Sequence, residues 1–271
     1  MMDLARALPV ALAAAFEASD LVMQVYRTAF TVDFKAADDP VTRADRESNA
    51  LLCDRLGAAF PGVPLVAEES DSRSYAGFAA SDAVWFVDPL DGTREFIARN
   101  GEFAVMIGLA WGGRAALGVI VAPAWNRAFV GIVEDGAWEV RRDGSKIPIR
   151  VSGRAALPGA SVVVSRSRTP SRLAAALSAT VGAAATVHGS SGLKAALVAV
   201  GMHDVYFQPA PAGMRWDACA SDALVEAAGG ACSATDGTRI DYASGELVNS
   251  GGLLATNGRL HQQVIEAIRS A

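Results

Sequence analysis

The sequence predicts a mixed chain of helices and strands, α+β in its first half and α/β in its second. Between residues 83 and 142, apolar stretches follow one another with Gly and Asp turns between most of them, as in an antiparallel meander. From residue 161 onward, strands alternate with Ala-rich helices, which is typical of α/β organisation. Gly and Pro concentrate at 152–160, so we expect halves of residues 1–155 and 156–271.

The first half is expected to open with two helices and a short strand. The apolar residues after Arg6 resemble the start of a secretory signal, but Asp3 precedes them and the helical spacing continues through Tyr26. We therefore expect a packed helix, and no run of 18 consecutive apolar residues indicates a membrane span. Residues 43–60 predict a second helix, and residues 64–70 a strand that ends in acids.

Composition and charge exclude several classes of protein. The chain has 271 residues, 51% of them hydrophobic, which is enough for a substantial core. Its net charge is −5 and its Lys and Arg residues are scattered, so we expect no nucleic-acid polymer as a partner. The three cysteines lack CxxC spacing and the three histidines lack HxH or HxxxH spacing, which argues against a disulfide framework and a zinc site. Thiols of this kind fit a reducing, cytoplasmic compartment.

Acids gather where one apolar strand stops, in the stretch WFVDPLDGTREF. Asp88 follows an apolar run, Pro89 is expected to end the strand ladder, and Asp91 and Gly92 make a turn. Thr93 can begin a helix. Two carboxylates, a hydroxyl and helix-start N–H groups suit a hard divalent cation and a phosphate together. A plain Pro-Asp-Gly turn with a threonine cap fits the same residues equally well.

The other candidate acids have ordinary structural explanations when each is taken alone. Glu68 and Glu69 follow a strand, as acids of a solvated loop do. Asp217 precedes a clear helix and fits an N-cap, and Asp45 is likewise typical of a helix start. One competing chemistry is excluded, because DGT also ends the DxDGT motif of haloacid-dehalogenase-like phosphatases, whose nucleophilic aspartate is replaced here by Pro89.

Four motifs taken together resemble the inositol monophosphatase superfamily of magnesium-dependent, lithium-sensitive phosphatases. They follow the family's order and its usual separations: VTRAD at 41–45, EES at 68–70, DPLDGT at 88–93 and WD at 216–217. The resemblance implies a layered αβαβα sandwich with the site in a cleft between the two halves. It also implies a small phosphorylated substrate and a chain that is a monomer or a homodimer.

Within the superfamily, the sequence is most similar to the 3'(2'),5'-bisphosphate nucleotidases of the CysQ type. These enzymes remove a phosphate from 3'-phosphoadenosine 5'-phosphate, a by-product of sulfate-donor metabolism. The similarity rests on the charged pair at 94–95, on GSSGLK at 189–194 and on NSGGLLATN at 249–257. The sequence departs from many relatives in two places. Gly192 interrupts the Ser-Ser-Leu-Lys motif of those relatives, and Ala243 replaces the asparagine that usually follows the tyrosine, here Tyr242.

The resemblance also implies the residues of the site. Two or three Mg²⁺ ions would be held by oxygen donors of Glu68, Asp88, Asp91, Asp217 and the backbone carbonyl of Leu90. The residues with catalytic roles would be Asp45, Glu68 and Thr93. The substrate would contact Glu68, Leu90, Asp91, Gly92, Thr93, Ser191, Lys194 and Asp217.

The implied mechanism is direct attack of water on the phosphate, without a covalent intermediate. One metal, between Glu68 and Asp88, would lower the pKa of the water, and Thr93, paired with Asp45, would orient it and help to remove its proton. A second metal would neutralise charge on the leaving oxygen. The backbone N–H groups of Gly92 and Thr93 would bind the phosphate.

Two other functions stay open. The first is another phosphomonoesterase of the same fold, acting on inositol phosphates, histidinol phosphate or fructose bisphosphate. In the sequence, only the pocket residues Glu95, Ser191 and Lys194 distinguish a nucleotidase from such an enzyme. The second is a non-catalytic module that binds phosphate or a nucleotide through a vestigial metal site. The complete set of acids argues against this second function.

Overall fold

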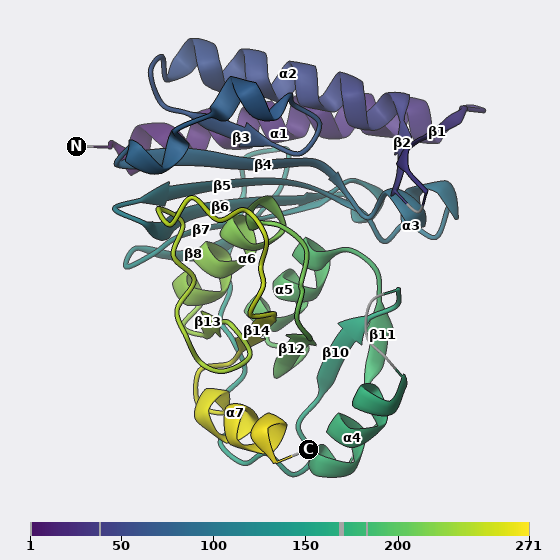
Figure 1. Cartoon of the computed structure of the whole chain (residues 1–271), viewed down its shortest axis with the longest axis vertical. Helices are drawn as coiled ribbons and strands as arrows, with labels where there is room; N and C mark the ends of the chain where they lie inside the picture. The colour runs from purple at the N-terminus through teal and green to yellow at the C-terminus, as the bar shows by residue number, and fades with distance from the viewer. Residues whose placement is uncertain (1, 38, 168–170, 183, 271) are drawn as a thin grey trace.

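The chain folds into layers of helices and sheets (Figure 1). The structure, a computed structural model, describes residues 2–37, 39–167, 171–182 and 184–270. Two long helices, α1 (Leu4–Tyr26) and α2 (Arg43–Ala59), pack against each other and cover one face of a seven-stranded sheet. Both helices are where the sequence predicts them.

The large sheet confirms the predicted meander. Its strand order is β3-β4-β5-β6-β7-β8-β9, antiparallel from β4 onward, with β3 parallel to β4. Almost every residue of β4, β5 and β6 is buried, because helices cover both faces of the sheet. The strands are β3 (Leu65–Ala67), β4 (Ala83–Asp91), β5 (Ala104–Trp111), β6 (Arg114–Ala122), β7 (Arg127–Ile132), β8 (Gly136–Val140) and β9 (Lys146–Pro148).

Strand β4 continues past Pro89, so the prediction that this proline ends the ladder is wrong. Both Asp88 and Asp91 pair with β5, and the register shifts between them. The irregularity lets the chain pass the proline, which has no N–H to donate, and then resume pairing. The N–H of Leu90, within the irregular stretch, donates to Oδ1 of Asp88 at 3.0 Å. The sheet itself therefore holds both aspartates, and the short helix α3 (Thr93–Ile97) follows directly.

The second half of the chain forms a smaller, mixed sheet with helices on both faces (Figure 1). Its strand order is β11-β10-β12-β14-β13, and β10 is parallel to both of its neighbours. The strands are β10 (Val162–Ser165), β11 (Thr186–His188), β12 (Val205–Gln208), β13 (Ala231–Ser233) and β14 (Leu253–Thr256). The helices are α4 (Ser171–Val181), α5 (Ser191–Ala199), α6 (Arg215–Ala227) and α7 (His261–Arg269). With α5 and α6 between the sheets and α4 and α7 outside, the αβαβα prediction is confirmed.

Two parts of the fold differ from the sequence predictions or add to them. A hairpin of β1 (Val32–Ala36) and β2 (Asp39–Thr42) stands outside both sheets and contacts α3 through β2; the sequence analysis did not predict it. Helix α1 is long and apolar enough to span a membrane by length and composition alone. In the structure its alanine-rich face, including Ala11 and Ala15, is buried against α2 and the large sheet, as a packed helix requires.

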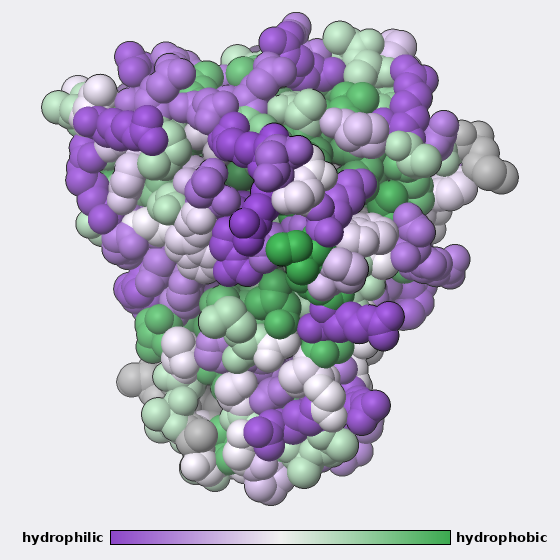
Figure 2. Space-filling view, turned by 180° about the vertical axis from the view of Figure 1, so that it is seen from behind, coloured by the Kyte–Doolittle hydropathy of each residue, from purple (hydrophilic) through white to green (hydrophobic). Residues whose placement is uncertain are grey.

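Hydrophobic side chains at the surface are scattered. On the face shown in Figure 2, hydrophilic residues are mixed with small hydrophobic patches. The exposed large hydrophobic residues of the described chain come from different elements and are Phe34, Ile147, Val187, Met202 and Val248. Single exposed apolar side chains are ordinary and indicate no binding surface by themselves.

Helix α6 lies directly on three glycines of the large sheet. Gly108 in β5 pairs with Gly118 in β6, which pairs with Gly131 in β7. A methyl group added to Gly118 would lie 2.3 Å from the backbone oxygen of Ala220. One added to Gly108 would lie 2.6 Å from the backbone nitrogen of Ala220. Only hydrogen atoms at these positions allow the helix to approach so closely. This approach places Asp217, in the first turn of α6, against β4.

We expect Gly118→Ala to lower the free energy of unfolding by about 1–3 kcal/mol, because the added methyl group overpacks a backbone contact. Gly57→Ala is the matched control, since its methyl group meets nothing within 4 Å in the last turn of α2. There, the higher helix propensity of alanine is expected to add up to about 1 kcal/mol of stability. Urea unfolding measures both variants, and equal effects would contradict the role of the glycine contact.

Asp222 is a buried acid in the middle of α6. Burial raises its pKa to about 7, with a contribution from the charge of Glu226. The hydroxyl of Tyr242, which donates to Oδ2 of Asp222 at 3.0 Å, lowers the pKa, as do Arg114 and Arg215. The folded state therefore binds a proton at Asp222 more tightly than the unfolded chain does. Ionisation of this group destabilises the fold.

The contribution of Asp222 to the free energy of unfolding is expected to fall as pH rises from about 4, its ordinary pKa, to about 7. The full change is up to about 4 kcal/mol, and it is complete above the folded pKa. Asp222→Asn retains an acceptor for Tyr242 but has no charge, so it should remove this part of the pH dependence. The test is urea unfolding of both proteins at pH 5 and pH 8. An identical pH dependence for the two would contradict the assignment.

Candidate active site

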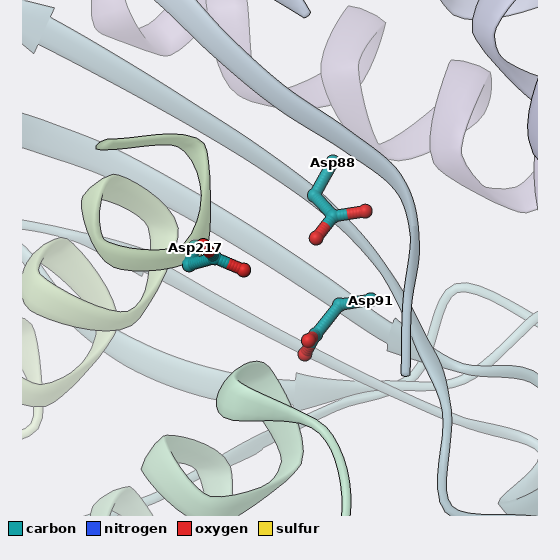
Figure 3. Close-up of side chains that lie close together, drawn as sticks. All are labelled: Asp88, Asp91 and Asp217. Carbon is teal, nitrogen blue, oxygen red and sulfur yellow. The ribbon is translucent and has the colours of Figure 1, made fainter. Parts of the chain in front are cut away.

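Three aspartates from two distant segments converge at one place. One carboxylate oxygen from each of Asp88, Asp91 and Asp217 lies within 4.8 Å of the others. Figure 3 shows the three carboxylates grouped between β4 and the first turn of α6. The sequence prediction of an acid cluster that includes both segments therefore agrees with the geometry.

The chain also orients these acids with hydrogen bonds. Oδ2 of Asp217 accepts from the N–H of Met214 at 2.6 Å, as part of the cap of α6. The prediction that Asp217 is the N-cap is wrong, because Met214 is the N-cap and Asp217 is the third residue of α6. Its carboxylate caps the helix from that position, and the same side chain also faces the other acids. The N–H of Leu90 holds Asp88 in a comparable way. Backbone donors bonded to a carboxylate fix its plane, which prepares it to bind a cation.

Glu68 joins the cluster together with a lysine that the sequence analysis missed. Lys35, on β1, places its Nζ 3.0 Å from Oε1 of Glu68 and 2.6 Å from Oε1 of Glu69. Burial lowers the pKa of Lys35, but the two carboxylates outweigh this effect and raise the pKa above its ordinary value. The only signal for Lys35 in the sequence was the strand-like alternation of VDFKA.

The carboxylates of the site outnumber the positively charged side chains that pair with them. Burial raises the pKa of Asp88 well above its ordinary range, and the charges of Glu68, Asp91 and Asp217 raise it further. Burial also raises the pKa of Glu68, Lys35 lowers it and Asp217 raises it, with a net value of about 7. Crowded carboxylates with only oxygen donors fit divalent cations such as Mg²⁺.

A short chain of hydrogen bonds lies beside the acids. Oγ1 of Thr93 donates to Oδ1 of Asp45 at 2.8 Å, and the carbonyl oxygen of Leu90 is 3.2 Å from the same hydroxyl. Oδ2 of Asp45 accepts from both the N–H and the hydroxyl of Thr42, at 2.7 and 2.6 Å. Burial raises the pKa of Asp45, although these hydrogen bonds lower it. Asp45 is thus both a helix-start acid, as one explanation of the sequence expected, and the partner of Thr93.

One cleft of about 560 Å³ brings these groups together. Its lining includes every residue that the sequence analysis gave as a substrate contact, namely Glu68, Leu90, Asp91, Gly92, Thr93, Ser191, Lys194 and Asp217. Asp45 is not part of the lining and reaches the cleft through Thr93. The cleft also includes residues that were not predicted, among them Lys35 and Gln208.

The GSSGLK segment, residues 189–194, also lines the cleft, but the side chains of Ser191 and Lys194 already have partners within the protein. Lys194 is buried, and its Nζ donates to the backbone carbonyls of Gly189 and Ser190. The same Nζ lies 5.0 Å from the ring centre of Tyr206. Oγ of Ser191 lies 3.1 Å from the Tyr206 hydroxyl and donates to the backbone oxygen of Asp217 at 3.2 Å. Substrate contact by Ser191 and Lys194 stays a prediction.

A network of charges at the edge of the cleft was also missed by the sequence analysis. Arg166, just after β10, pairs with both oxygens of Glu102 and lies 3.5 Å from Glu95. Oε2 of Glu102 also accepts from the N–H of Gly189 at 2.6 Å. No periodic pattern could have revealed contacts between residues so far apart in the chain.

The fold and the site together define a metal-binding hydrolase of phosphate esters. The chain belongs to the inositol monophosphatase family, whose model matches residues 3–271. This membership confirms the resemblance found in the sequence, and the chain is a phosphatase of a metal-dependent family.

Individual relatives narrow the comparison. The chain is 37% identical to the 3'(2'),5'-bisphosphate nucleotidase CysQ of Escherichia coli (strain K12) over 227 residues, which cover 83% of this chain and 89% of that protein. Among solved structures, it is similar to an inositol monophosphatase from Anabaena (Nostoc) sp. PCC 7120, with a TM-score of 0.81, 29% identity and coverage of 100% and 98%. It is also similar to CysQ from Bacteroides thetaiotaomicron, with a TM-score of 0.75, 27% identity and coverage of 92% and 96%.

Proposed function

We propose that this phosphatase hydrolyses 3'(2'),5'-bisphosphate nucleotides, such as 3'-phosphoadenosine 5'-phosphate, to AMP and phosphate. The convergence of Asp88, Asp91 and Asp217 in one cleft with Thr93 and its partner Asp45 is the observation that carries the proposal. The nucleotide preference is supported by the 37% identity to CysQ of Escherichia coli. The two solved structures, at 29% and 27% identity, do not discriminate between an inositol monophosphatase and a CysQ protein.

The proposed cofactor is Mg²⁺, as two or three ions. The donors would be the carboxylates of Glu68, Asp88, Asp91 and Asp217 and the carbonyl of Leu90, all of which line the cleft. When bound, Mg²⁺ supplies charge neutralisation for the phosphate and lowers the pKa of a bound water. The donor set supports this choice, because Mg²⁺ prefers carboxylates and carbonyls to the nitrogen and sulfur ligands of zinc sites.

The residues Thr93 and Asp45 would orient the attacking water and receive its proton. The Thr93 hydroxyl donates to Asp45, so its oxygen is left to accept a hydrogen bond from water in the cleft. Thr42 holds the other oxygen of Asp45, which keeps the pair in one orientation. A positioned pair of this kind acts as a general base without forming a covalent bond to phosphorus.

The phosphate would be bound by backbone N–H groups of Gly92 and Thr93. Gly92 adopts a φ of +93°, a conformation that favours glycine, and a methyl group there would lie 2.9 Å from the backbone oxygen of Glu102. The first N–H groups of a helix have no partner within the helix, so they can donate to an anion. Glycine is therefore needed where the chain turns from β4 into α3.

We also propose that the enzyme is cytoplasmic and acts on a small phosphorylated substrate, as a monomer or a homodimer. Cys53, Cys219 and Cys232 are free thiols, which fits a reducing compartment. A nucleic-acid polymer is not expected, since the net charge of −5 offers no attraction to its backbone.

Phosphate release from 3'-phosphoadenosine 5'-phosphate and from inositol 1-phosphate, measured side by side, tests the substrate. We expect kcat/KM to be about ten-fold or more higher for the nucleotide. Activity should be lost with EDTA, restored by Mg²⁺ and reduced by Li⁺. A preference for the inositol ester would contradict the nucleotide assignment and keep the metal chemistry. No hydrolysis of any phosphomonoester would favour the non-catalytic module.

Replacing the proposed proton acceptors tests the mechanism. Thr93→Val and Asp45→Asn should each lower kcat by about 10²–10⁴-fold, because they remove the group that orients the water or receives its proton. The affinity for Mg²⁺ should change little. Thr28→Val is the matched control, since it removes a hydroxyl that donates to a backbone oxygen at the end of α1. If Thr93→Val retained the kcat of the Thr28→Val enzyme, the proposed role of Thr93 would be wrong.

A further inference from the structure

We propose that Ser190 is a positioning residue that orients Asp91 for cation binding. This inference rests on the proposed role of Asp91 as a metal ligand. Ser190 is the N-cap of α5 and stands next to Ser191, the serine that the sequence analysis selected. Its hydroxyl donates to Asp91, an acid of the large sheet.

Two donors at the N-terminal end of α5 hold one oxygen of Asp91. Oδ2 accepts from the Ser190 hydroxyl and from the N–H of Gly192, the latter at 2.8 Å. Asp91 is 7% exposed and Ser190 5% exposed, so little water competes for these bonds. Two donors on one oxygen fix the plane of the carboxylate. That plane sets which lone pairs face Asp88 and Asp217 (Figure 3).

Ser190 has the geometry of a residue held in place for this purpose. Its oxygen accepts from the N–H of Leu193 at 3.1 Å while its hydrogen is donated to Asp91, so both functions of the hydroxyl are used. Its φ of +53° is uncommon for a residue with a side chain and costs on the order of 1 kcal/mol. Strain of this kind persists only where surrounding contacts maintain it.

Contacts from the N-terminal part of the chain maintain the turn. The N–H of Gly189 donates to Oε2 of Glu102 at 2.6 Å, and Arg166 pairs with the same carboxylate. A methyl group at Gly189 would lie 2.3 Å from Cγ of Glu95, so the turn packs directly on that side chain. The segment 189–192 is therefore held against Glu95 and Glu102, and Asp91 receives its orientation from the connection between β11 and α5 and from the first turn of α5.

The expected effect is on cation affinity more than on folding. Loss of a hydrogen bond to a metal-ligating side chain typically lowers metal affinity about 10–100-fold. Ser190→Gly removes the hydroxyl and suits the positive φ. Glycine is also nearly as good as serine at a helix N-cap. The variant therefore separates the positioning role from a structural one.

The test measures Mn²⁺ binding to the metal-free protein by electron paramagnetic resonance, without substrate. Urea unfolding in EDTA measures the stability of the same variants. Asp91→Asn serves as the reference variant. The Mn²⁺ site whose affinity it weakens is the site to which Asp91 contributes a ligand. We expect Ser190→Gly to weaken that same affinity about 10–100-fold with little change in the free energy of unfolding. Ser233→Ala is the control, because it removes a buried hydroxyl that donates to the carbonyl of Ala234, contacts Nε2 of His261 and is not part of the cleft lining.

The outcomes separate this proposal from the proposed function. If Asp91→Asn weakens Mn²⁺ binding and Ser190→Gly binds as the wild type does, the positioning role is wrong and the metal role of Asp91 stands. If Asp91→Asn itself binds Mn²⁺ as the wild type does, Asp91 is not a ligand and both proposals fail. A loss of stability in Ser190→Gly that matches its loss of affinity would also overturn the positioning role, because the effect would then be on folding.

Discussion

The close contact between α6 and the large sheet decides where the acids of the site lie. Gly108, Gly118 and Gly131 remove the side chains that would keep the helix away, so the backbone of Ala220 rests on the strands. The first turn of α6 then brings Asp217 to the aspartates of β4. The geometry of the site is therefore a consequence of helix-to-sheet packing in the middle of the molecule.

Packing alone does not favour this arrangement, because it places like charges together. The raised pKa values of Asp88 and Glu68 reflect the cost of ionising buried, neighbouring carboxylates. The irregular stretch of β4 and the cap of α6 supply N–H donors that offset part of this cost. A cation that binds only the folded chain offsets more, by about 2.7 kcal/mol at a concentration of one hundred times its Kd. With the proposed cofactor, the site would exchange stability of the metal-free fold for affinity toward Mg²⁺.

The sequence was sufficient for the long elements and for the family, and three of the acids that it selected as metal ligands lie close together in the structure. Periodicity located α1, α2 and the meander, and the motifs around Asp88 and Asp217 identified a family whose fold the structure shares. The sequence was insufficient where contacts between distant parts of the chain determine the structure. A register shift carries β4 past Pro89, the hairpin that holds Lys35 is short and mostly exposed, and the contact of Ser190 with Asp91 joins residues 99 positions apart. Of these features only the hairpin has a local signal, the alternation of VDFKA, and that signal does not reveal the partners of Lys35.

The central claim is that acids from three segments form one cation site. Crystals grown with Mn²⁺ and measured for anomalous scattering would test it most directly, since the signal locates the ion without assumptions about its ligands. The account predicts anomalous density in the cleft, coordinated by the carboxylates of Asp88, Asp91 and Asp217, with Glu68 bound to the same or a neighbouring ion. An empty cleft, with Lys35 still paired to Glu68 and the ions bound elsewhere, would contradict it.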